Sequence, residues 1–179
     1  QTVEDFALYS GKELDEQETE ALRTAAGQMS AKMRAVRIVS AASVSRRDLE
    51  ARLVRKGEDP KQAKEAVAWM EELHLVDDRA TAEQVVSSCI SKGYGLARAK
   101  QALYEKRIPK EYWDEALADY PDQTEKITAF LKSRLDADSD EKQVRRAVDA
   151  LIRRGHSYGT IRRALDALSF DTEDFQEEF

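Results

Sequence analysis

A helical hairpin that recurs three times along the chain is the feature that most constrains its fold. The first copy, residues 45–70, reads SRRDLEARLVRKGEDPKQAKEAVAWM. Apolar residues recur three or four positions apart in both halves of this segment, as they do on the buried face of a helix. These residues are Leu49, Leu53, Ala63, Val67 and Met70. The pattern predicts two short helices, each with one apolar stripe.

The signals that start and stop these two helices are also present. Ser45 is expected to cap the first helix, with Asp48 reaching back to it from the third helical position. Gly57 supplies the left-handed residue that ends this helix, because glycine adopts positive φ without steric cost. Asp59 and Pro60 open the second helix, where the N–H that proline lacks has no helical partner anyway.

The two later copies align with the first without a gap, at offsets of 50 and then 48 residues. The aligned positions are Leu49/Ala99/Ala147, Leu53/Leu103/Leu151, Gly57/Arg107/Gly155, Ala63/Trp113/Ile161 and Val67/Leu117/Leu165. In the second copy Arg107 stands where the other two have glycine. A recurrence of this length is typical of helical modules that bury their apolar faces against their neighbours.

These patterns predict an all-α protein, an elongated array of tandem three-helix repeats behind an N-terminal lead-in helix. Residues 1–43 form the N-terminal segment and lead-in helix, which Gly27 could break. Repeats are expected at 44–93, 94–138 and 139–179, each with a third helix, and the last repeat is truncated and followed by an acidic tail. The repeated hairpin carries most of this prediction.

Composition argues against several other classes of protein. Of 179 residues, 36% are charged and only seven are glycine, which favours a helix-rich protein with much solvated surface over a sheet with many turns. Because Cys89 is the only cysteine, no internal disulfide can form, and a cytoplasmic location is expected. No apolar run is long enough to span a membrane, so no membrane contact is expected. We also expect a monomer.

Charge is sorted in blocks that the net charge of −6 conceals. Residues 30–110 carry 17 basic and 11 acidic side chains, and residues 144–168 carry six and two. Between them, residues 111–143 carry four basic and ten acidic side chains. Two basic regions flanking an acidic strip suit a partner with phosphates or a mixed-charge protein surface. The alternative is that these charges only solvate the helices.

Basic residues recur with the repeat, and stacking of the modules would turn them into a ribbon of positive charge. We expect this ribbon to bind a partner or DNA through phosphates or carboxylates rather than by reading bases, because exposed aromatic side chains are scarce. The candidate residues are Arg46, Arg47, Arg55, Lys56, Arg98, Lys100, Lys106, Arg107, Arg145, Arg146, Arg153, Arg154, Arg162 and Arg163.

Signs of catalysis and of metal or cofactor binding are missing from the sequence. The Lys92–Gly95 segment is too short for a phosphate-binding loop. His74 and His156 have no cysteine or histidine at metal-ligand spacing. Cys89 lies on an apolar helix face and is expected in the core. We therefore expect a binding protein with no catalytic residues, no metal and no cofactor.

Three segments in order resemble the RecX family of regulatory proteins. They are SRRDLEARLVRKG at 45–57, the turn with Asp77 and Asp78 after Leu75, and SKGYGLARAKQALYEKRIPKEYWDEAL at 91–117. The resemblance is clearest over residues 45–117, continues more weakly to Leu168, and leaves residues 1–30 uncovered. Each motif alone is of low specificity, whereas their order and spacing together are more specific.

This resemblance implies a protein that lies along the RecA recombinase filament and modulates it, usually by inhibiting its ATPase, strand-exchange and coprotease activities. Such a role belongs to homologous recombination, DNA repair and the SOS response. It also implies weaker, non-specific contact with single- or double-stranded DNA. Arg107 and the shortened last repeat depart from the family pattern. The alternative is a helical-repeat protein that binds DNA directly, without a recombinase.

Overall fold

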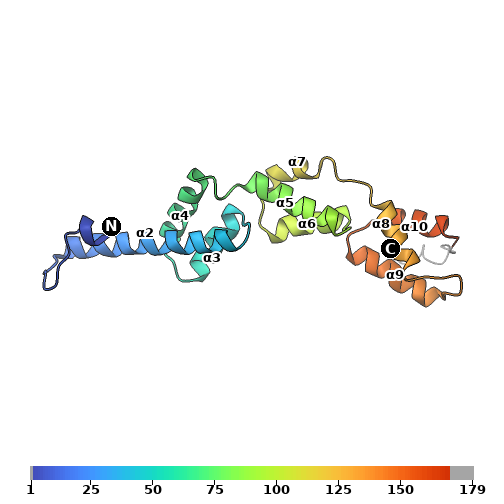
Figure 1. Cartoon of the computed structure of the whole chain (residues 1–179), viewed down its shortest axis with the longest axis horizontal. Coiled ribbons are helices and arrows are strands. Elements are labelled where there is room, and N and C mark those ends of the chain that lie inside the picture. Colours follow the sequence, from blue (N-terminus) through green and yellow to red (C-terminus); the bar gives the residue numbers. More distant parts are fainter. Residues whose placement is uncertain (1, 170–179) are drawn as a thin grey trace. The chain divides into compact units, whose positions relative to one another are not determined.

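A computed structural model describes residues 2–169, and every regular element within that range is a helix (Figure 1). The predicted all-helical fold is therefore confirmed for the described chain. In order, the elements are α1 (Thr2–Asp5), α2 (Glu16–Ala41), α3 (Arg46–Arg55), α4 (Pro60–Glu72), α5 (Asp78–Ser91), α6 (Leu96–Glu105), the 3-10 turn η1 (Lys110–Tyr112), α7 (Trp113–Leu117), α8 (Thr124–Lys132), α9 (Glu141–Arg153) and α10 (Tyr158–Ala167).

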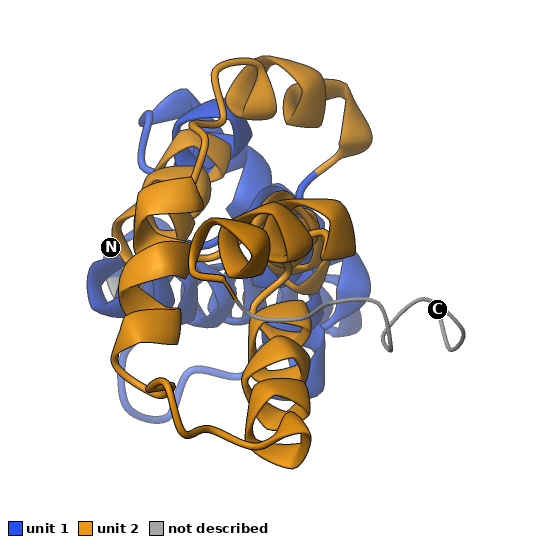
Figure 2. Cartoon of the chain, turned by 90° about the vertical axis from the view of Figure 1, so that its right-hand side faces the viewer, with its two compact units in different colours: residues 1–81, 106–108 blue, residues 82–105, 109–179 orange. Residues whose placement is uncertain are grey.

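The chain divides into two compact units, coloured separately in Figure 2. The first unit comprises residues 1–81 together with residues 106–108, the turn that follows α6. The second unit comprises residues 82–105 and 109–179. The turn 106–108 therefore packs with the first unit, although the residues on either side of it in the sequence belong to the second.

The core of the first unit lies among α2, α3 and α4. Leu49 and Leu53 of α3 and Met70 of α4 are completely buried there. The lead-in helix contributes Ala31 and Ala35, which are also completely buried, so α2 shares one core with the first hairpin. Small side chains at these two positions let the α2 backbone come close to its neighbours.

Helix α2 is continuous through Gly27, so this glycine does not break it. Met29, Met33 and Val36 recur three or four residues apart on this helix, a spacing that predicts a buried face, but they are not buried. These three side chains are exposed, at 39%, 52% and 40% respectively. The structure instead buries Ala31 and Ala35, because their small side chains fit closely against α3 and α4.

The second unit has its main core among α8, α9 and α10. Ile127 and Leu131 of α8 pack with Val148 and Leu151 of α9 and with Ile161, among others, of α10. Helices α5 and α6 bury a separate set of side chains, namely Ala82, Val86, Cys89, Ala99 and Leu103. Cys89 is a buried free cysteine, as its place on an apolar helix face predicted.

The aligned positions of the three hairpins have matching environments. Leu53, Leu103 and Leu151 are exposed by 1% or less. Trp113 and Leu117 of the second copy are only half-buried, whereas their counterparts in the other copies are buried. The reason is local: in the second copy the long second helix is replaced by η1 and the five-residue α7.

The left-handed turn is the most regular feature of the repeat. Gly57 has φ of 92° and Gly155 has φ of 86°. Arg107, at the aligned position of the second copy, has φ of 56° although it is not glycine. All three copies therefore place a left-handed residue at the turn, and only the second copy forces an L-residue into it.

The caps largely follow the predictions. Ser45 Oγ accepts a hydrogen bond from the N–H of Asp48, and Asp59 Oδ1 accepts from the N–H groups of Lys61 and Gln62. The side chain of Asp48, however, forms an ion pair with Arg52 at 2.8 Å rather than reaching back to Ser45. An arginine one turn further along the helix offers a charged partner in place of a neutral N–H.

The cores group the helices differently from the predicted repeat. Each main core joins a preceding helix to the hairpin that follows it, as α2 joins α3–α4 and α8 joins α9–α10. The predicted repeat instead joined each hairpin to the helix after it. The domain boundaries after residues 43, 93 and 138 stay predictions, and the acidic segment 170–179 predicted to end the third repeat lies outside the described residues.

Truncation of the equivalent leucines tests the repeat. Leu53→Ala, Leu103→Ala and Leu151→Ala should each lower the free energy of unfolding by about 2–5 kcal/mol, because each leaves a cavity in a closely packed site. Chemical denaturation followed by circular dichroism measures the change. A neutral result at any one position would show that this copy is wrongly aligned.

Substitution of the left-handed arginine tests the turn. Arg107→Gly should raise the free energy of unfolding by up to about 1 kcal/mol, because glycine removes the strain of the left-handed conformation. Lys106→Gly is the matched control, since Lys106 is the neighbouring residue and does not have positive φ. That control should be neutral or destabilising, and stabilisation by both changes would contradict the explanation.

Candidate functional site

Two hydrogen-bonded contacts of the same kind bring basic residues of successive hairpins together. In the first unit, Ser45 Oγ donates a hydrogen bond to the carbonyl oxygen of Lys106 at 2.6 Å. Ser45 is completely buried, so this hydrogen bond is shielded from solvent. We call this contact, with its flanking residues 45–47 and 106–108, the first joint.

The second joint has the same arrangement within the second unit. Here the N–H of Gly95 donates to the carbonyl oxygen of Arg154 at 2.8 Å, and the N–H of Ala97 donates to that of Gly155 at 3.2 Å. We use the name second joint for this contact between residues 92–98 and residues 153–157. Ser45 and Gly95 are 50 residues apart, and Lys106 and Arg154 are 48 apart, so each joint uses equivalent positions of the repeat.

Close approach of two backbones distinguishes the second joint. A Cβ atom on Gly95 would overlap the carbonyl oxygen of Gly155, and a Cβ atom on Gly155 would overlap the backbone nitrogen of Arg98. Both positions therefore require glycine for space, and Gly155 also requires it for its positive φ. The first joint has side chains at these positions, because Ser45 and Arg107 stand there.

The first joint gathers four of the predicted basic residues. Arg47 and Arg107 are exposed and Lys106 is half-buried. Arg46 is paired within the molecule. Its guanidinium lies 2.9 Å from the carboxylate of Glu71, and its backbone N–H donates a hydrogen bond to Asp78 Oδ1 at 2.8 Å. Burial raises the pKa of Asp78, and the hydrogen bond from Arg46 opposes this effect.

The second joint gathers Arg98, Arg153 and Arg154, together with Lys92, which the sequence pattern did not indicate. Arg98 is half-buried and pairs with Glu105 at 3.1 Å, whereas Lys92 and Arg153 are exposed. Lys92 directly precedes Gly93, and a Lys-Gly pair by itself predicts only the end of a helix. Its place at the flank of the joint becomes visible only in the structure.

Arg154 has a structural role in this joint. Its Nη2 donates to the carbonyl oxygen of Lys92 at 3.3 Å, and its Cζ lies 5.7 Å from the ring centre of Tyr94 and 5.4 Å from that of Phe130. Cation–π interactions of this kind hold a guanidinium in place. Arg154 thereby ties α9 to the turn before α6 and has less freedom to contact a partner.

Neutral polar groups complete the second joint. His156 Nε2 lies 3.0 Å from the carbonyl oxygen of Gly93, and burial lowers the pKa of this imidazole. Tyr120 donates its hydroxyl hydrogen to the carbonyl oxygen of Tyr94 at 2.6 Å, and burial raises its pKa to about 12. At neutral pH both side chains are therefore uncharged, so the positive charge of the joint comes from its arginine and lysine side chains.

The remaining predicted residues lie away from the joints. Arg55 and Lys56 are exposed at the turn after α3, Lys100 is exposed on α6, and Arg145 and Arg146 are exposed on α9. On α10, Arg163 is exposed and Arg162 lies 4.0 Å from Asp166. The first unit thus holds six of the fourteen predicted residues and the second unit holds eight. A continuous ribbon over both units stays a prediction.

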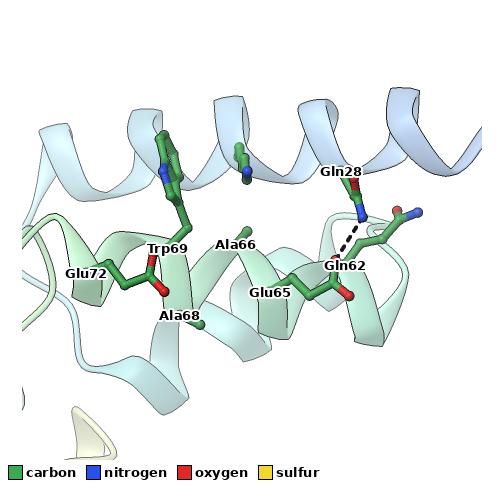
Figure 3. A pocket seen from close by; sticks show the side chains of 8 residues that line it. Gln28, Gln62, Glu65, Ala66, Ala68, Trp69 and Glu72 are labelled. Atoms are coloured by element: carbon green, nitrogen blue, oxygen red, sulfur yellow. Dashed lines mark hydrogen bonds between the residues drawn. The ribbon is translucent and has the colours of Figure 1, made fainter. Parts of the chain in front are cut away.

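Each unit has a pocket, and the pocket of the second unit is lined in part by residues of the second joint. One, of about 340 Å³, lies between α2 and α4 and is lined by Trp69, Glu65 and Glu72, with Gln28 donating to Glu65 at 3.1 Å (Figure 3). Lys32 Nζ lies 5.1 Å from the Trp69 ring centre. The other, of about 570 Å³, lies in the second unit among the starts of α6 and α10 and the 120–123 loop. In the second pocket, His156 Nε2 contacts the carbonyl oxygen of Gly93, and Ser157 Oγ contacts Thr160 Oγ1.

Metal-binding clusters and membrane-spanning helices are not found in the described part of the chain. Within residues 2–169, no three histidine, cysteine or carboxylate side chains come together as metal ligands do. No helix in the same range is both long enough and apolar enough to cross a bilayer. The exposed basic side chains beside the two joints are the best candidates for a functional surface.

Comparisons with known proteins agree on one family. Residues 77–117 match a family model described as the second three-helix domain of RecX, which covers α5, α6 and α7. The regulatory protein RecX of Chlorobaculum tepidum is 32% identical over 135 residues, covering 73% of this chain and 83% of the relative. That of Clostridioides difficile is 26% identical over 176 residues, covering 94% and 82%.

Solved structures show the same fold. A crystal structure of a regulatory protein RecX superimposes with a TM-score of 0.70 at 22% identity, covering 92% of this chain and 84% of that chain. The structure of RecX from Lactobacillus salivarius gives a TM-score of 0.69 at 22% identity, covering 81% and 98%. At this level of identity the two structures support the fold alone.

Substitution of two equivalent glycines tests the close approach at the second joint. Gly57→Ala should cost about 1 kcal/mol of unfolding free energy, because a Cβ there meets only the left-handed strain and nothing within 4 Å. Gly155→Ala should cost clearly more, because its Cβ must also push Arg98 away. Denaturation of both variants makes the comparison, and equal decreases would show that the joint is not tightly packed in solution.

Proposed function

Because the chain belongs to the RecX family of regulatory proteins, whose members modulate the RecA recombinase, we propose that it binds the RecA–DNA filament and inhibits its ATPase, strand-exchange and coprotease activities. The protein is a regulator and not an enzyme. The observation that supports the proposed surface is the repetition of one joint, each time with exposed basic side chains on its rim.

The proposed mechanism follows from repetition. A filament presents the same acidic groups at regular intervals, whether carboxylates of its protein or phosphates of its DNA. Arg47 and Arg107 at the first joint, and Lys92 and Arg153 at the second, offer separate positive charges to such a lattice. Interactions that are individually weak add up when several modules bind at once. Bound across successive subunits, the chain hinders the changes that the filament needs for ATP hydrolysis and strand exchange.

Binding to DNA is expected to be weaker and non-specific. Arginine and lysine side chains on the joint rims suit phosphates, which carry no sequence information. Such binding falls steeply with salt because it depends on the release of counterions. We place the protein in the cytoplasm as a monomer, consistent with its buried free cysteine and with the location of a recombinase filament on DNA.

A second candidate function is direct DNA binding without a recombinase. The same basic residues favour it, because phosphates and protein carboxylates attract arginine and lysine alike. The two functions differ in what they need: a filament regulator acts on RecA at concentrations at which it leaves bare DNA unoccupied. Measuring RecA ATP hydrolysis on single-stranded DNA together with the chain's own affinity for that DNA separates the two.

Charge reversal at the joints tests the proposal. We expect Arg47→Glu with Arg107→Glu to weaken inhibition of the RecA ATPase, and Lys92→Glu with Arg153→Glu to weaken it by a similar factor. The combination of all four changes should weaken it further than either pair, because each joint contributes separately. For DNA alone, the slope of log affinity against log salt should become shallower by roughly one unit for each phosphate that the variant no longer binds.

Lys61→Glu with Lys64→Glu is the matched control, since both side chains are exposed on α4 and the change in net charge is the same. This control should leave inhibition nearly unchanged. An equal decrease in the control would mean that net charge alone matters, and that the joints are not the surface. If the unmodified protein affects the ATPase only when it coats the DNA, direct DNA binding is the better explanation.

A further inference from the structure

The pocket of the first unit has a chemistry opposite to that of the basic residues beside the joints. It lies between α2 and α4, and its lining carries two carboxylates and a single ammonium group (Figure 3). Glu65, Trp69 and Glu72 form its wall on α4. These residues are four and then three positions apart, so all three lie on one face of the helix. The pocket therefore combines an aromatic ring with two negative charges.

Neither carboxylate of the pocket is paired with a cation of the described chain. Glu65 accepts a hydrogen bond from the neutral amide of Gln28 at 3.1 Å, and Glu72 forms no hydrogen bond or ion pair with any described residue. Both side chains are exposed. Glu71, directly before Glu72 in the sequence, is by contrast paired with Arg46 at 2.9 Å. The negative charge of the pocket is thus available to a cation from outside.

The ring of Trp69 already holds one cation. Lys32 of α2 places its Nζ 5.1 Å from the centre of the ring, which is a cation–π contact. Its ammonium group forms no ion pair with any described carboxylate. A lysine side chain is long and flexible, so Lys32 can turn from the ring into solvent. The contact shows where in the pocket a cation fits.

A glycine makes room for a further acceptor in the pocket. Gly27 lies inside α2, where glycine is less favourable than alanine. A Cβ atom at this position would overlap the side-chain amide of Gln62, which lines the pocket from α4. The absence of a side chain on Gly27 therefore lets the Gln62 amide approach α2. Its oxygen adds a neutral acceptor to the two carboxylates.

We propose that this pocket binds an arginine side chain of a partner protein, and we call it the arginine pocket. A guanidinium group is planar, so it stacks on an aromatic ring while its N–H groups donate to a carboxylate. Its five donors match the acceptors that Gln62, Glu65 and Glu72 offer. An arriving arginine carries the same charge as Lys32, and it takes the place of that ammonium group on the Trp69 ring.

The charges of the pocket favour a protein over a nucleic acid as the partner. Two carboxylates repel phosphates, whereas a protein surface offers cations as well as anions. Lysine fits less well than arginine, because its ammonium group is a compact point charge that does not stack. The inference goes beyond the proposed function, because it concerns residues other than the basic ones and does not require that the partner be RecA.

N-acetyl-arginine amide is the probe that tests the arginine pocket with the full chain. NMR follows the indole N–H signals of the two tryptophans, and Trp113→Phe assigns them. The probe should shift the Trp69 signal until it saturates, with a dissociation constant in the millimolar range because one side chain makes few contacts. The Trp113 signal should stay in place. N-acetyl-citrulline amide has nearly the same shape without the charge, and an equal shift by it would overturn the proposal.

Two further ligands distinguish an arginine within a protein from the free amino acid. The peptide acetyl-Gly-Arg-Gly-amide should bind at least as tightly as the probe. Free arginine should bind more weakly, because its own carboxylate is repelled by Glu65 and Glu72. The reverse order would show a site for the free amino acid, and the proposal of a protein partner would be wrong.

Removal of the internal cation gives a result that a merely structural pocket would not. Lys32→Ala should tighten binding of the probe about two- to fivefold, because the ammonium group that competes for the ring is gone. Lys64→Ala is the matched control, since Lys64 is exposed on α4 and does not line the pocket. It should leave the affinity nearly unchanged. Equal tightening in both variants, or none in Lys32→Ala, would contradict the proposed competition.

Neutralising the carboxylates should have the opposite effect. Glu65→Gln with Glu72→Gln should weaken binding of the probe about fivefold, because two exposed charge pairs are lost. Glu13→Gln with Glu20→Gln changes the net charge equally at exposed positions of the first unit outside the pocket, and should leave binding unchanged. An equal decrease in this control would mean that net charge alone attracts the probe.

The affinity of the same variants for DNA completes the test. Glu65→Gln with Glu72→Gln should bind DNA as well as or better than the unmodified protein, because it repels phosphates less. A lower affinity for DNA would mean that the pocket contacts nucleic acid, and the inference would be wrong. None of these measurements uses RecA, so the arginine pocket and the proposed inhibition of the filament can fail separately.

Discussion

The hydrogen bond at each joint depends on the left-handed residue beside its acceptor. A helix normally ends with carbonyl groups that no helical N–H can reach. At positions 107 and 155 a residue with positive φ reverses the chain at once, and the carbonyl before it accepts a hydrogen bond from another hairpin. The turn thus ends a helix and also connects two hairpins. The short hairpins would otherwise have few groups with which to hold a neighbour.

The same kind of turn ends a helix and accepts the hydrogen bond at both joints. The joints therefore share one arrangement and differ only in the residues that form it. The second joint has glycine on both sides, so backbone bonds backbone at short range. In the first joint a serine hydroxyl reaches the carbonyl of Lys106 beside the bulkier Arg107. Arg107 tolerates an unfavourable conformation because the surrounding structure fixes it. The result is an exposed arginine at the first joint, on the surface that we propose binds a partner.

The same geometry separates structural from available arginines. Arg154 crosses the second joint to the Tyr94 ring, whereas Arg46 pairs with Glu71 of α4 and Arg98 pairs with Glu105 of its own helix. Neighbouring residues such as Arg47 and Arg153 extend their charge into solvent. A doublet of arginines in the sequence therefore tends to contain one residue of each kind. In the proposed contact with a filament, the exposed residues would bind the partner and the paired residues would hold their helices in place.

The sequence alone determined the helices, their caps and the repeat, because these follow from local spacing and from a few residues with special backbone preferences. Leu53, Leu103 and Leu151 could be aligned without coordinates, and the same alignment put Arg107 at the position of two glycines, where the structure has a positive φ. The family resemblance rested on the same local motifs and agrees with the comparisons. Tertiary structure decided which faces meet, and on α2 only packing selected Ala31 and Ala35 over the methionines. Nor could the sequence identify the joints, because Ser45 and Lys106 are 61 residues apart and a single hydrogen bond between them leaves no periodic signal. Local patterns reflect local energies, whereas contacts between distant segments depend on shapes that exist only once the helices have packed.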